Sequence, residues 1–155
     1  MNCGTCGAVA DGYVCHYCGN STEKVQGSQD EMPALAEFHQ MLDGHDKEKQ
    51  VELLRNGFLP SDTQALIEAG LRCIPLLHSE EYDTITPASK GRLLAIVTKL
   101  RLMKPDAQIE RAVTEFERNL KQQKKASRRV DLIILIMGLI ILAGIVWVIW
   151  YFTKG

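Results

Sequence analysis

The sequence lacks the motifs that mark the common classes of enzyme. It contains no glycine-rich phosphate-binding loop and no GxSxG nucleophile turn. The histidines of the middle region form no HExxH motif, and we expect them at surface or hydrogen-bonded positions (His39, His45 and His78). The acidic run Glu80, Glu81 and Asp83 is typical of a solvated loop rather than of a cation site. The sequence therefore predicts a protein that is not an enzyme.

A strong net charge is also absent. The 155 residues carry 18 basic and 19 acidic side chains, a formal net charge of −1. This balance excludes a globally basic nucleic-acid binder and a globally acidic disordered tail. The two halves differ, however, because residues 1–83 carry a net charge of −9 and residues 84–155 one of +8. Either the chain is oriented toward a charged surface, or acidic and basic faces of one domain pack together.

No apolar segment occurs near residue 1, so the sequence does not predict a secretory signal peptide. Charge is absent instead from residues 132–152, a largely apolar run of 21 residues. As a helix this run would measure about 31 Å, close to the roughly 30 Å hydrocarbon core of a bilayer. A buried core helix would show a polar face, and this run shows none. We therefore predict a single transmembrane helix over residues 131–152 and a tail-anchored protein.

The flanks of the apolar run predict its orientation. Only Lys154 follows the run, whereas five basic residues precede it: Lys121, Lys124, Lys125, Arg128 and Arg129. The positive-inside rule then places the N-terminus in the cytosol. Trp147, Trp150 and Tyr151 lie near the far end, where amphipathic aromatic rings favour the membrane interface. We expect a single-pass membrane protein whose N-terminal part is cytosolic.

Four of the five cysteines lie near the N-terminus, as Cys3-Gly-Thr-Cys6 and Cys15-His-Tyr-Cys18. Gly7 and Gly19 follow the two pairs, and glycine accepts the positive φ that turns backbone N–H groups toward sulfur. Four thiolates complete a closed tetrahedral shell, which is typical of structural zinc. Disulfides and a CxxC redox centre are the alternatives; a cytosolic location disfavours the first, and two symmetric pairs disfavour the second. We predict one structural Zn²⁺ held by Cys3, Cys6, Cys15 and Cys18.

The N-terminal segment MNCGTCGAVADGYVCHYCGN resembles the short zinc-ribbon family found in many membrane-attached and multidomain proteins, especially bacterial ones. The family's CPxCG knuckles flank a brief β-hairpin, so the resemblance implies a zinc ribbon with a small hairpin over residues 1–22. Gly4 and His16 replace the usual prolines, and Val14 replaces the usual aromatic residue. The resemblance implies an interaction or structural module. We expect a bacterial inner membrane rather than a eukaryotic organelle membrane.

Lysine and arginine are absent from residues 1–22. Because phosphate contacts supply most of the affinity for nucleic acids, we do not expect this segment to bind them. With four cysteines completing the shell, we expect His16 to be an exposed residue rather than a ligand. Tyr13 and Tyr17 should pack on the hairpin or contact a protein partner.

The middle of the chain has a helical pattern. Residues 23–31 are polar and predict a linker, and the apolar spacing over residues 32–104 predicts a cytosolic helical bundle. Ser61-Asp-Thr-Gln64 has the pattern of a capping box, and Pro75 should kink or end the helix that follows. Cys73 lies in an apolar context, which predicts a buried, inert thiol rather than a nucleophile.

The apolar pattern restarts near Asp106, with no helix breaker between it and the membrane span. We therefore predict an amphipathic, basic stalk helix over residues 105–130. The expected fold class is mainly α, with an N-terminal zinc ribbon, a small helical bundle and a C-terminal transmembrane helix.

These features predict a non-enzymatic adaptor that presents a zinc-ribbon and helical surface to a protein partner on the cytosolic side of a membrane. One alternative is an accessory subunit of a larger multi-span membrane complex. Another is a membrane-tethered regulator that binds nucleic acid or anionic lipid headgroups. Its contacts would come from residues 84–104, which contain no acidic side chain and five basic ones: Lys90, Arg92, Lys99, Arg101 and Lys104.

Overall fold

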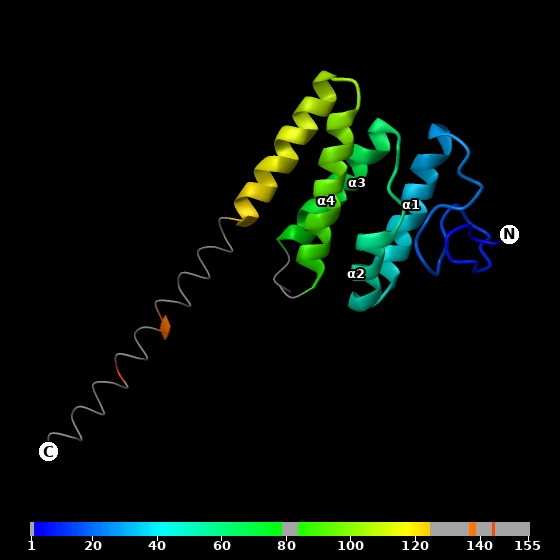
Figure 1. The fold of residues 1–155 in the computed structure, drawn as a ribbon, viewed down its shortest axis with the longest axis horizontal. Helices are drawn as coiled ribbons and strands as arrows, with labels where there is room; N and C mark the ends of the chain where they lie inside the picture. The colour runs from blue at the N-terminus through cyan, green and yellow to red at the C-terminus, as the bar shows by residue number, and fades with distance from the viewer. Residues whose placement is uncertain (1, 79–83, 125–136, 139–143, 145–155) are drawn as a thin grey trace, which may run out of the picture. The chain divides into compact units, whose positions relative to one another are not determined.

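The computed structural model describes residues 2–78, 84–124, 137–138 and 144, and these residues are mainly helical (Figure 1). The labelled helices are α1 (Ser28–Gly44), α2 (Lys47–Asn56), α3 (Thr63–Leu77) and α4 (Ile85–Leu102). A further helical segment covers residues 107–124. The chain divides into two compact units, Met1–Leu120 and Lys121–Gly155. The prediction of a mainly α chain with a small helical bundle is confirmed.

Side-chain caps explain where two of the helices begin. Asp46 caps α2, because its carboxylate accepts a hydrogen bond from the Lys49 backbone N–H at 2.9 Å. Asp62 caps α3 by accepting from two backbone N–H groups of the first turn. The sequence predicts Ser61 as the cap of α3, one residue too early. The Ser61 hydroxyl instead accepts a hydrogen bond from Lys99 Nζ at 3.0 Å.

Two helix boundaries differ from the sequence prediction. α1 begins at Ser28, inside the predicted linker of residues 23–31, and Asp30 lies in its first turn, where a negative charge favours the helix dipole. α3 continues through Pro75 and ends at Leu77, so Pro75 does not end the helix, one of its two predicted effects. The connection between the cysteine segment and the bundle is therefore shorter than predicted.

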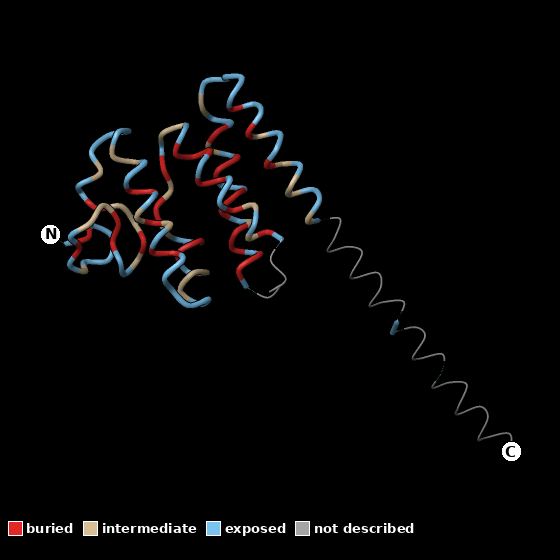
Figure 2. Tube along the Cα trace, turned by 180° about the vertical axis from the view of Figure 1, so that it is seen from behind, coloured by how far each residue is buried: buried red, intermediate tan, exposed pale blue. Residues whose placement is uncertain are grey.

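One apolar core holds the Met1–Leu120 unit together. α4 packs against α3 and α2, and α1 contacts α2 and α3. Figure 2 shows the buried positions spread along all of these helices. The fully buried side chains of this core include Phe38, Leu53, Leu54, Leu66, Leu93, Ile96 and Leu100. Burial of one such side chain contributes about 1.5–3 kcal/mol relative to exposure, so this cluster is the main source of stability.

The helical segment that starts at residue 107 also belongs to this core. Ile109, Ala112 and Phe116 are buried in the same cluster. The Phe116 ring lies on Gly70 of α3, where an added Cβ would be 2.4 Å from two ring carbons. The sequence predicts these residues as part of a stalk over residues 105–130. The structure corrects this up to Leu120, because the apolar stripe of the segment packs against the bundle.

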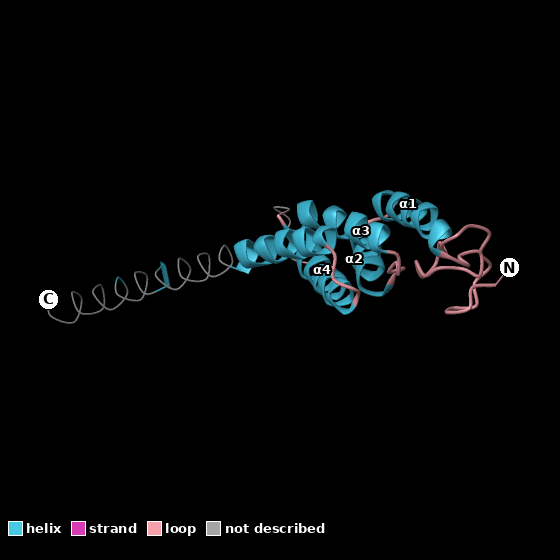
Figure 3. Ribbon diagram, turned by 90° about the horizontal axis from the view of Figure 1, so that it is seen from above, coloured by secondary structure: helices cyan, strands magenta, loops and turns pink. Residues whose placement is uncertain are grey.

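The N-terminal segment contains no strand among its described residues (Figure 3). Two isolated antiparallel bridges occur instead, Asn2–Val9 and Val14–Ser21. Each bridge joins the two ends of one cysteine turn, and we call these turns the first knuckle (residues 2–9) and the second knuckle (residues 14–21). The hairpin that the family resemblance implies is therefore not formed, because each knuckle pairs with itself.

No helix in the described part of the chain is both long and apolar enough to cross a membrane. The span predicted over residues 131–152 lies outside the described residues, apart from positions 137, 138 and 144. Residues 125–130 of the predicted stalk and the acidic run Glu80, Glu81 and Asp83 also lie outside them.

Candidate metal centre

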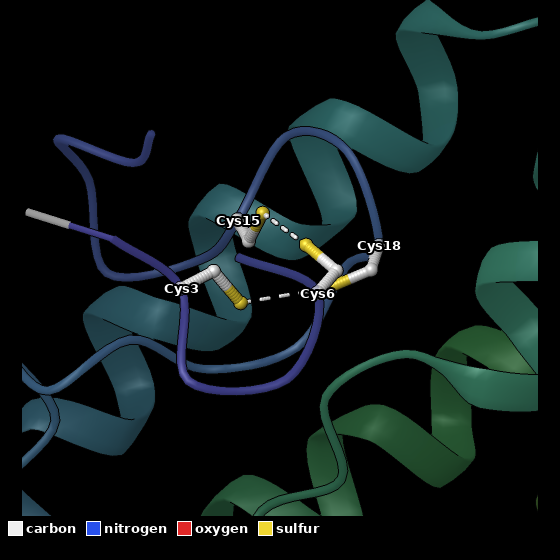
Figure 4. A group of neighbouring side chains, drawn as sticks. All are labelled: Cys3, Cys6, Cys15 and Cys18. Atoms are coloured by element: carbon white, nitrogen blue, oxygen red, sulfur yellow. Dashed lines mark hydrogen bonds between the residues drawn. The ribbon is translucent and has the colours of Figure 1, made fainter. Parts of the chain in front are cut away.

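The four N-terminal cysteines converge on one point (Figure 4). Their Sγ atoms all lie within 4.8 Å of one another. The Sγ atoms of Cys3 and Cys18 are 3.7 Å apart, and those of Cys6 and Cys15 are also 3.7 Å apart. A tetrahedral Zn²⁺ with Zn–S bonds of about 2.3 Å needs neighbouring sulfur atoms about 3.8 Å apart. The structure thus brings together all four predicted ligands at a spacing that fits a metal ion.

The two knuckles make the same backbone turn. Gly7 has φ +76° and Gly19 has φ +73°, so both adopt the left-handed conformation that the sequence predicts. The Gly7 N–H donates a hydrogen bond to the Cys3 carbonyl at 2.9 Å, and the Gly19 N–H donates to the Cys15 carbonyl at 2.8 Å. These bonds close each turn around its pair of sulfur atoms.

Backbone N–H groups and neighbouring thiols set the acidity of the first knuckle. The pKa of Cys3 is lowered to about 6, because the N–H groups of Cys6 and Thr5 donate hydrogen bonds to its sulfur. The Ala8 N–H lowers the pKa of Cys6, but desolvation and the three neighbouring thiols together raise it to about 12. Thiolates are the metal-binding form. Four of them can share this small volume when a cation offsets their charge, which is what a bound metal supplies.

The four ligands differ in their exposure to solvent. Cys3 and Cys15 are buried, Cys18 is half-buried and Cys6 is exposed. The Asn20 side-chain amide donates a hydrogen bond to Cys18 Sγ at 3.7 Å, which helps to orient that sulfur. A shell of four protein ligands leaves no open coordination position for a substrate. The arrangement therefore fits a structural metal rather than a catalytic one.

The second knuckle packs on α2 and its C-terminal loop. Val14 is fully buried and belongs to the main apolar core. The Phe58 N–H, just beyond α2, donates a hydrogen bond to the Gly19 carbonyl at 2.6 Å. An added Cβ on Gly19 would lie 2.5 Å from Leu53 Cδ2. The four-cysteine site and the bundle therefore share a packed interface.

Two charged side chains strengthen this interface. Glu37 of α1 accepts a hydrogen bond from the Tyr13 backbone N–H at 2.7 Å. Lys49 of α2 donates to the Tyr17 carbonyl at 2.6 Å, and its Nζ lies 5.2 Å from the centre of the Tyr17 ring. The first contact holds the backbone just before the second knuckle, and the other holds the backbone between Cys15 and Cys18. The sequence gives no signal for them, because the partners are more than 20 residues apart.

The other candidate residues lie outside the metal centre. The His16 side chain is exposed, with Nε2 3.8 Å from Glu37 Oε1, as expected for a residue that is not a ligand. Cys73 is buried, and burial raises the pKa of its thiol to about 11, which fits the predicted unreactive thiol. His45 and His78 are exposed, and His39 is half-buried.

Several side chains of the basic stretch 84–104 are engaged within the chain. Arg92 is buried, and its guanidinium donates to the carbonyls of Leu54, Gly57 and Phe58. Lys99 donates to the Pro60 carbonyl at 2.6 Å, and Arg101 forms an ion pair with Glu117. Sequence reasoning missed the role of Arg92. The available signal was its helical spacing, since it lies three residues after Ser89 and four before Ile96 on the buried face of α4.

Comparison with known proteins identifies no relative of this chain. The chain matches no protein-family model, no curated protein and no solved structure. For residues 1–22 the structure shows four sulfur atoms close enough to hold a metal ion, and it identifies no family.

Proposed function

We propose that this chain is a non-enzymatic, membrane-anchored adaptor that presents a zinc-stabilised surface to a protein partner on the cytosolic side. The observation that carries the proposal is the closed four-cysteine site, docked on a helical bundle. Such a site has a structural role, because protein ligands fill all four coordination positions of the metal and hold the surrounding surface in one shape. Soft thiolate ligands at tetrahedral spacing favour Zn²⁺ over hard cations such as Mg²⁺ or Ca²⁺.

The knuckles offer apolar side chains to a partner. Val9 of the first knuckle is 83% exposed, and Tyr17 of the second is 68% exposed. Tyrosine is enriched at protein interfaces, because its ring supplies contact area and its hydroxyl a hydrogen bond. The absence of lysine and arginine from residues 1–22 favours a protein partner over a nucleic acid at this surface.

The internal contacts of the basic stretch 84–104 count against the lipid and nucleic-acid alternatives. Arg92, Lys99 and Arg101 are committed to carbonyl or carboxylate partners within the chain. Engaged and buried cations contribute less to binding of an external phosphate than solvated ones do. These basic side chains therefore help to hold the unit together.

The membrane part of the proposal comes from the sequence. The uncharged run 132–152 supplies the anchor, and the basic residues that precede it favour a cytosolic N-terminus. We propose a bacterial inner membrane as the location. The partner can be a soluble protein or a multi-span membrane protein, and the second case makes the chain an accessory subunit of a larger complex.

Site-specific crosslinking in native membranes tests the proposed function. A photoreactive amino acid would replace Tyr17 in the full chain, and Leu102 of α4, which is 84% exposed, would be the matched control position. We expect one discrete protein to be crosslinked from Tyr17 and not from Leu102, and the crosslink to be lost when Cys6→Ser removes a metal ligand. Crosslinks from Tyr17 that persist in Cys6→Ser, or none in wild type, would contradict the adaptor. Crosslinks that arise only from the apolar run 132–152 would favour the accessory-subunit alternative.

A further inference from the structure

The two knuckles have the same internal turn but different surroundings. An added Cβ at Gly4 or Gly7 of the first knuckle would meet nothing within 4 Å. An added Cβ at Gly19 of the second knuckle would meet Leu53 Cδ2 at 2.5 Å and the Gly57 Cα at 3.4 Å. The first knuckle is therefore open to its surroundings at both glycines, whereas the second is pressed against α2 and the loop that follows it.

Among the described residues, the backbone hydrogen bonds of the first knuckle stay within it. The Cys3 N–H donates to the Ala8 carbonyl at 2.7 Å, and the Gly7 N–H donates to the Cys3 carbonyl at 2.9 Å. Its one branched apolar side chain, Val9, is 83% exposed and contributes nothing to the main core. The buried cluster around Cys3 consists only of cysteine and alanine side chains. Ordering the backbone of one residue costs about 1–2 kcal/mol of conformational entropy. The burial of so few small apolar side chains cannot offset that cost over the eight residues of the knuckle.

The contacts between the first knuckle and the second are made by the sulfur atoms of their cysteines. Each of its two cysteines faces a cysteine of the second knuckle, with Cys3 opposite Cys18 and Cys6 opposite Cys15, both at 3.7 Å (Figure 4). A metal ion bound by all four thiolates joins the two knuckles by coordinate bonds. The second knuckle has other attachments, through Val14 in the core and through the Phe58 hydrogen bond to Gly19.

We propose that the metal acts as a clasp on the first knuckle alone. Its removal releases residues 2–9 as a unit, while residues 14–21 stay docked on α1 and α2. This inference rests on the proposed zinc site and gives the proposed binding surface a metal-responsive half. Loss of the metal moves Val9 away from the surface and leaves Tyr17 in place, so a partner that needs both is released when zinc is removed.

Hydrogen exchange with peptide-level mass spectrometry on the full chain in detergent tests the clasp. The zinc content of the sample is measured first, and the metal is then removed with a chelator in the presence of a thiol reductant. We expect exchange in residues 2–10 to accelerate by about tenfold or more. Exchange in residues 14–21 and 53–60 should change by less than about threefold, because the contacts of Val14 and Gly19 with the bundle do not involve the metal.

Two variants with zinc present separate the metal's role from that of the chain. Cys6→Ser should reproduce the fast exchange of residues 2–10, and Thr5→Ser, in the same knuckle, should not. Equal loss of protection in residues 14–21 and 53–60 would overturn the clasp, and so would full protection of residues 2–10 without metal. A chain that takes up no zinc would overturn it as well. A clasp that behaves as expected without any Tyr17 crosslink would refute the adaptor function and leave this inference standing.

Discussion

Gly19 lies so close to α2 that a Cβ on it would be 2.5 Å from Leu53 Cδ2. Gly7 occupies the equivalent position in the first knuckle, with nearly the same positive φ, and open space surrounds it. The two glycines therefore separate two requirements. Both positions need a left-handed backbone to form the turn, but only Gly19 also needs the absence of a side chain for docking.

We expect Gly19→Ala to lower the free energy of unfolding of the bundle more than Gly7→Ala does. Each substitution strains its own knuckle by about 1–2 kcal/mol for a left-handed alanine, and only the second knuckle is packed on the bundle. Gly19→Ala adds a clash with a packed core, typically about 1–3 kcal/mol. Urea unfolding of the zinc-loaded proteins, followed by far-UV circular dichroism, measures the difference. If the two substitutions lowered the free energy of unfolding equally, the packing of Gly19 against α2 would not contribute to the stability of the bundle.

The same glycines show what the sequence could reveal. The cysteine spacing and the glycine after each pair encode a local turn, so the ligand set and both positive φ angles were predictable. The docking of Gly19 on Leu53 was not, because it depends on which apolar faces meet across more than 30 residues. Helix periodicity predicted that residues 107–120 are amphipathic and could not say whether that face meets the bundle or forms a stalk. The prediction of a hairpin was wrong for a similar reason. The sequence does not show whether the two knuckles pair with each other or each pairs with itself.

The buried Arg92 gives a second prediction. Its Cζ lies 4.6 Å from the centre of the Phe38 ring, and its N–H groups satisfy the carbonyls at the end of α2. Burial lowers its pKa below the ordinary value. We expect Arg92→Met to lower the free energy of unfolding by about 2–4 kcal/mol, because buried carbonyls lose their donors. Arg92→Lys should lie between wild type and Met, since lysine lacks the planar fork.

Lys90, two residues earlier on α4 and half-buried, is the control for this experiment. Lys90→Met removes a cation from the same helix and should change the free energy of unfolding by no more than about 0.5 kcal/mol. If Arg92→Met were as mild as Lys90→Met, the guanidinium would not be holding α4 to the end of α2.

His39 predicts a specific pH dependence of stability. Its pKa is lowered to about 4, because desolvation and then the charges of Arg72 and Arg92 disfavour the imidazolium, against a smaller opposing effect of Asp43. In the unfolded chain a histidine has a pKa of about 6.5, so the unfolded state binds more protons between these two values. The stability from neutral His39 is fully present above about pH 6.5 and is lost as the pH falls toward 4.

We expect His39→Gln to reduce the fall in the free energy of unfolding between about pH 6.5 and pH 4. The reduction should be on the order of 1 kcal/mol, because the partial exposure of the ring weakens the effect. Urea unfolding at a series of pH values measures it. Acid also weakens the metal centre, and this contribution is common to both proteins, so the difference between their profiles isolates His39. A His39→Gln profile parallel to that of the wild type would contradict the prediction.

Phe116 distinguishes a core helix from a stalk. The ring is fully buried against Gly70 of α3, so Phe116→Ala should lower the free energy of unfolding of the bundle by about 3–5 kcal/mol. Glu115→Ala, on the exposed side of the same segment, should cost less than about 0.5 kcal/mol. Thermal or urea unfolding of the full chain in detergent provides the comparison. A stalk that does not contact the bundle would make both substitutions equally mild.

The metal centre itself gives the last prediction. Zinc analysis of the purified chain should give one ion for each chain, because four thiolates supply one closed shell. Cys3→Ser, Cys6→Ser, Cys15→Ser or Cys18→Ser should each remove most of the bound zinc, since a serine hydroxyl is a far poorer ligand than a thiolate. Cys73→Ser is the matched control, because Cys73 is buried in the core and should keep the full zinc content.

Removal of the metal should also reveal its energetic role. Apparent binding energies of about 10–16 kcal/mol are typical of small zinc modules, and this energy is available to order the knuckles. The chelated, reduced protein should keep most of its helical circular dichroism, because the core from Phe38 to Phe116 contains no metal ligand. If zinc were absent and the four cysteines were found as two disulfides, the centre would be a redox or covalent staple. Loss of all the helical signal with the metal would contradict this expectation. It would show that the buried core alone does not keep the bundle folded.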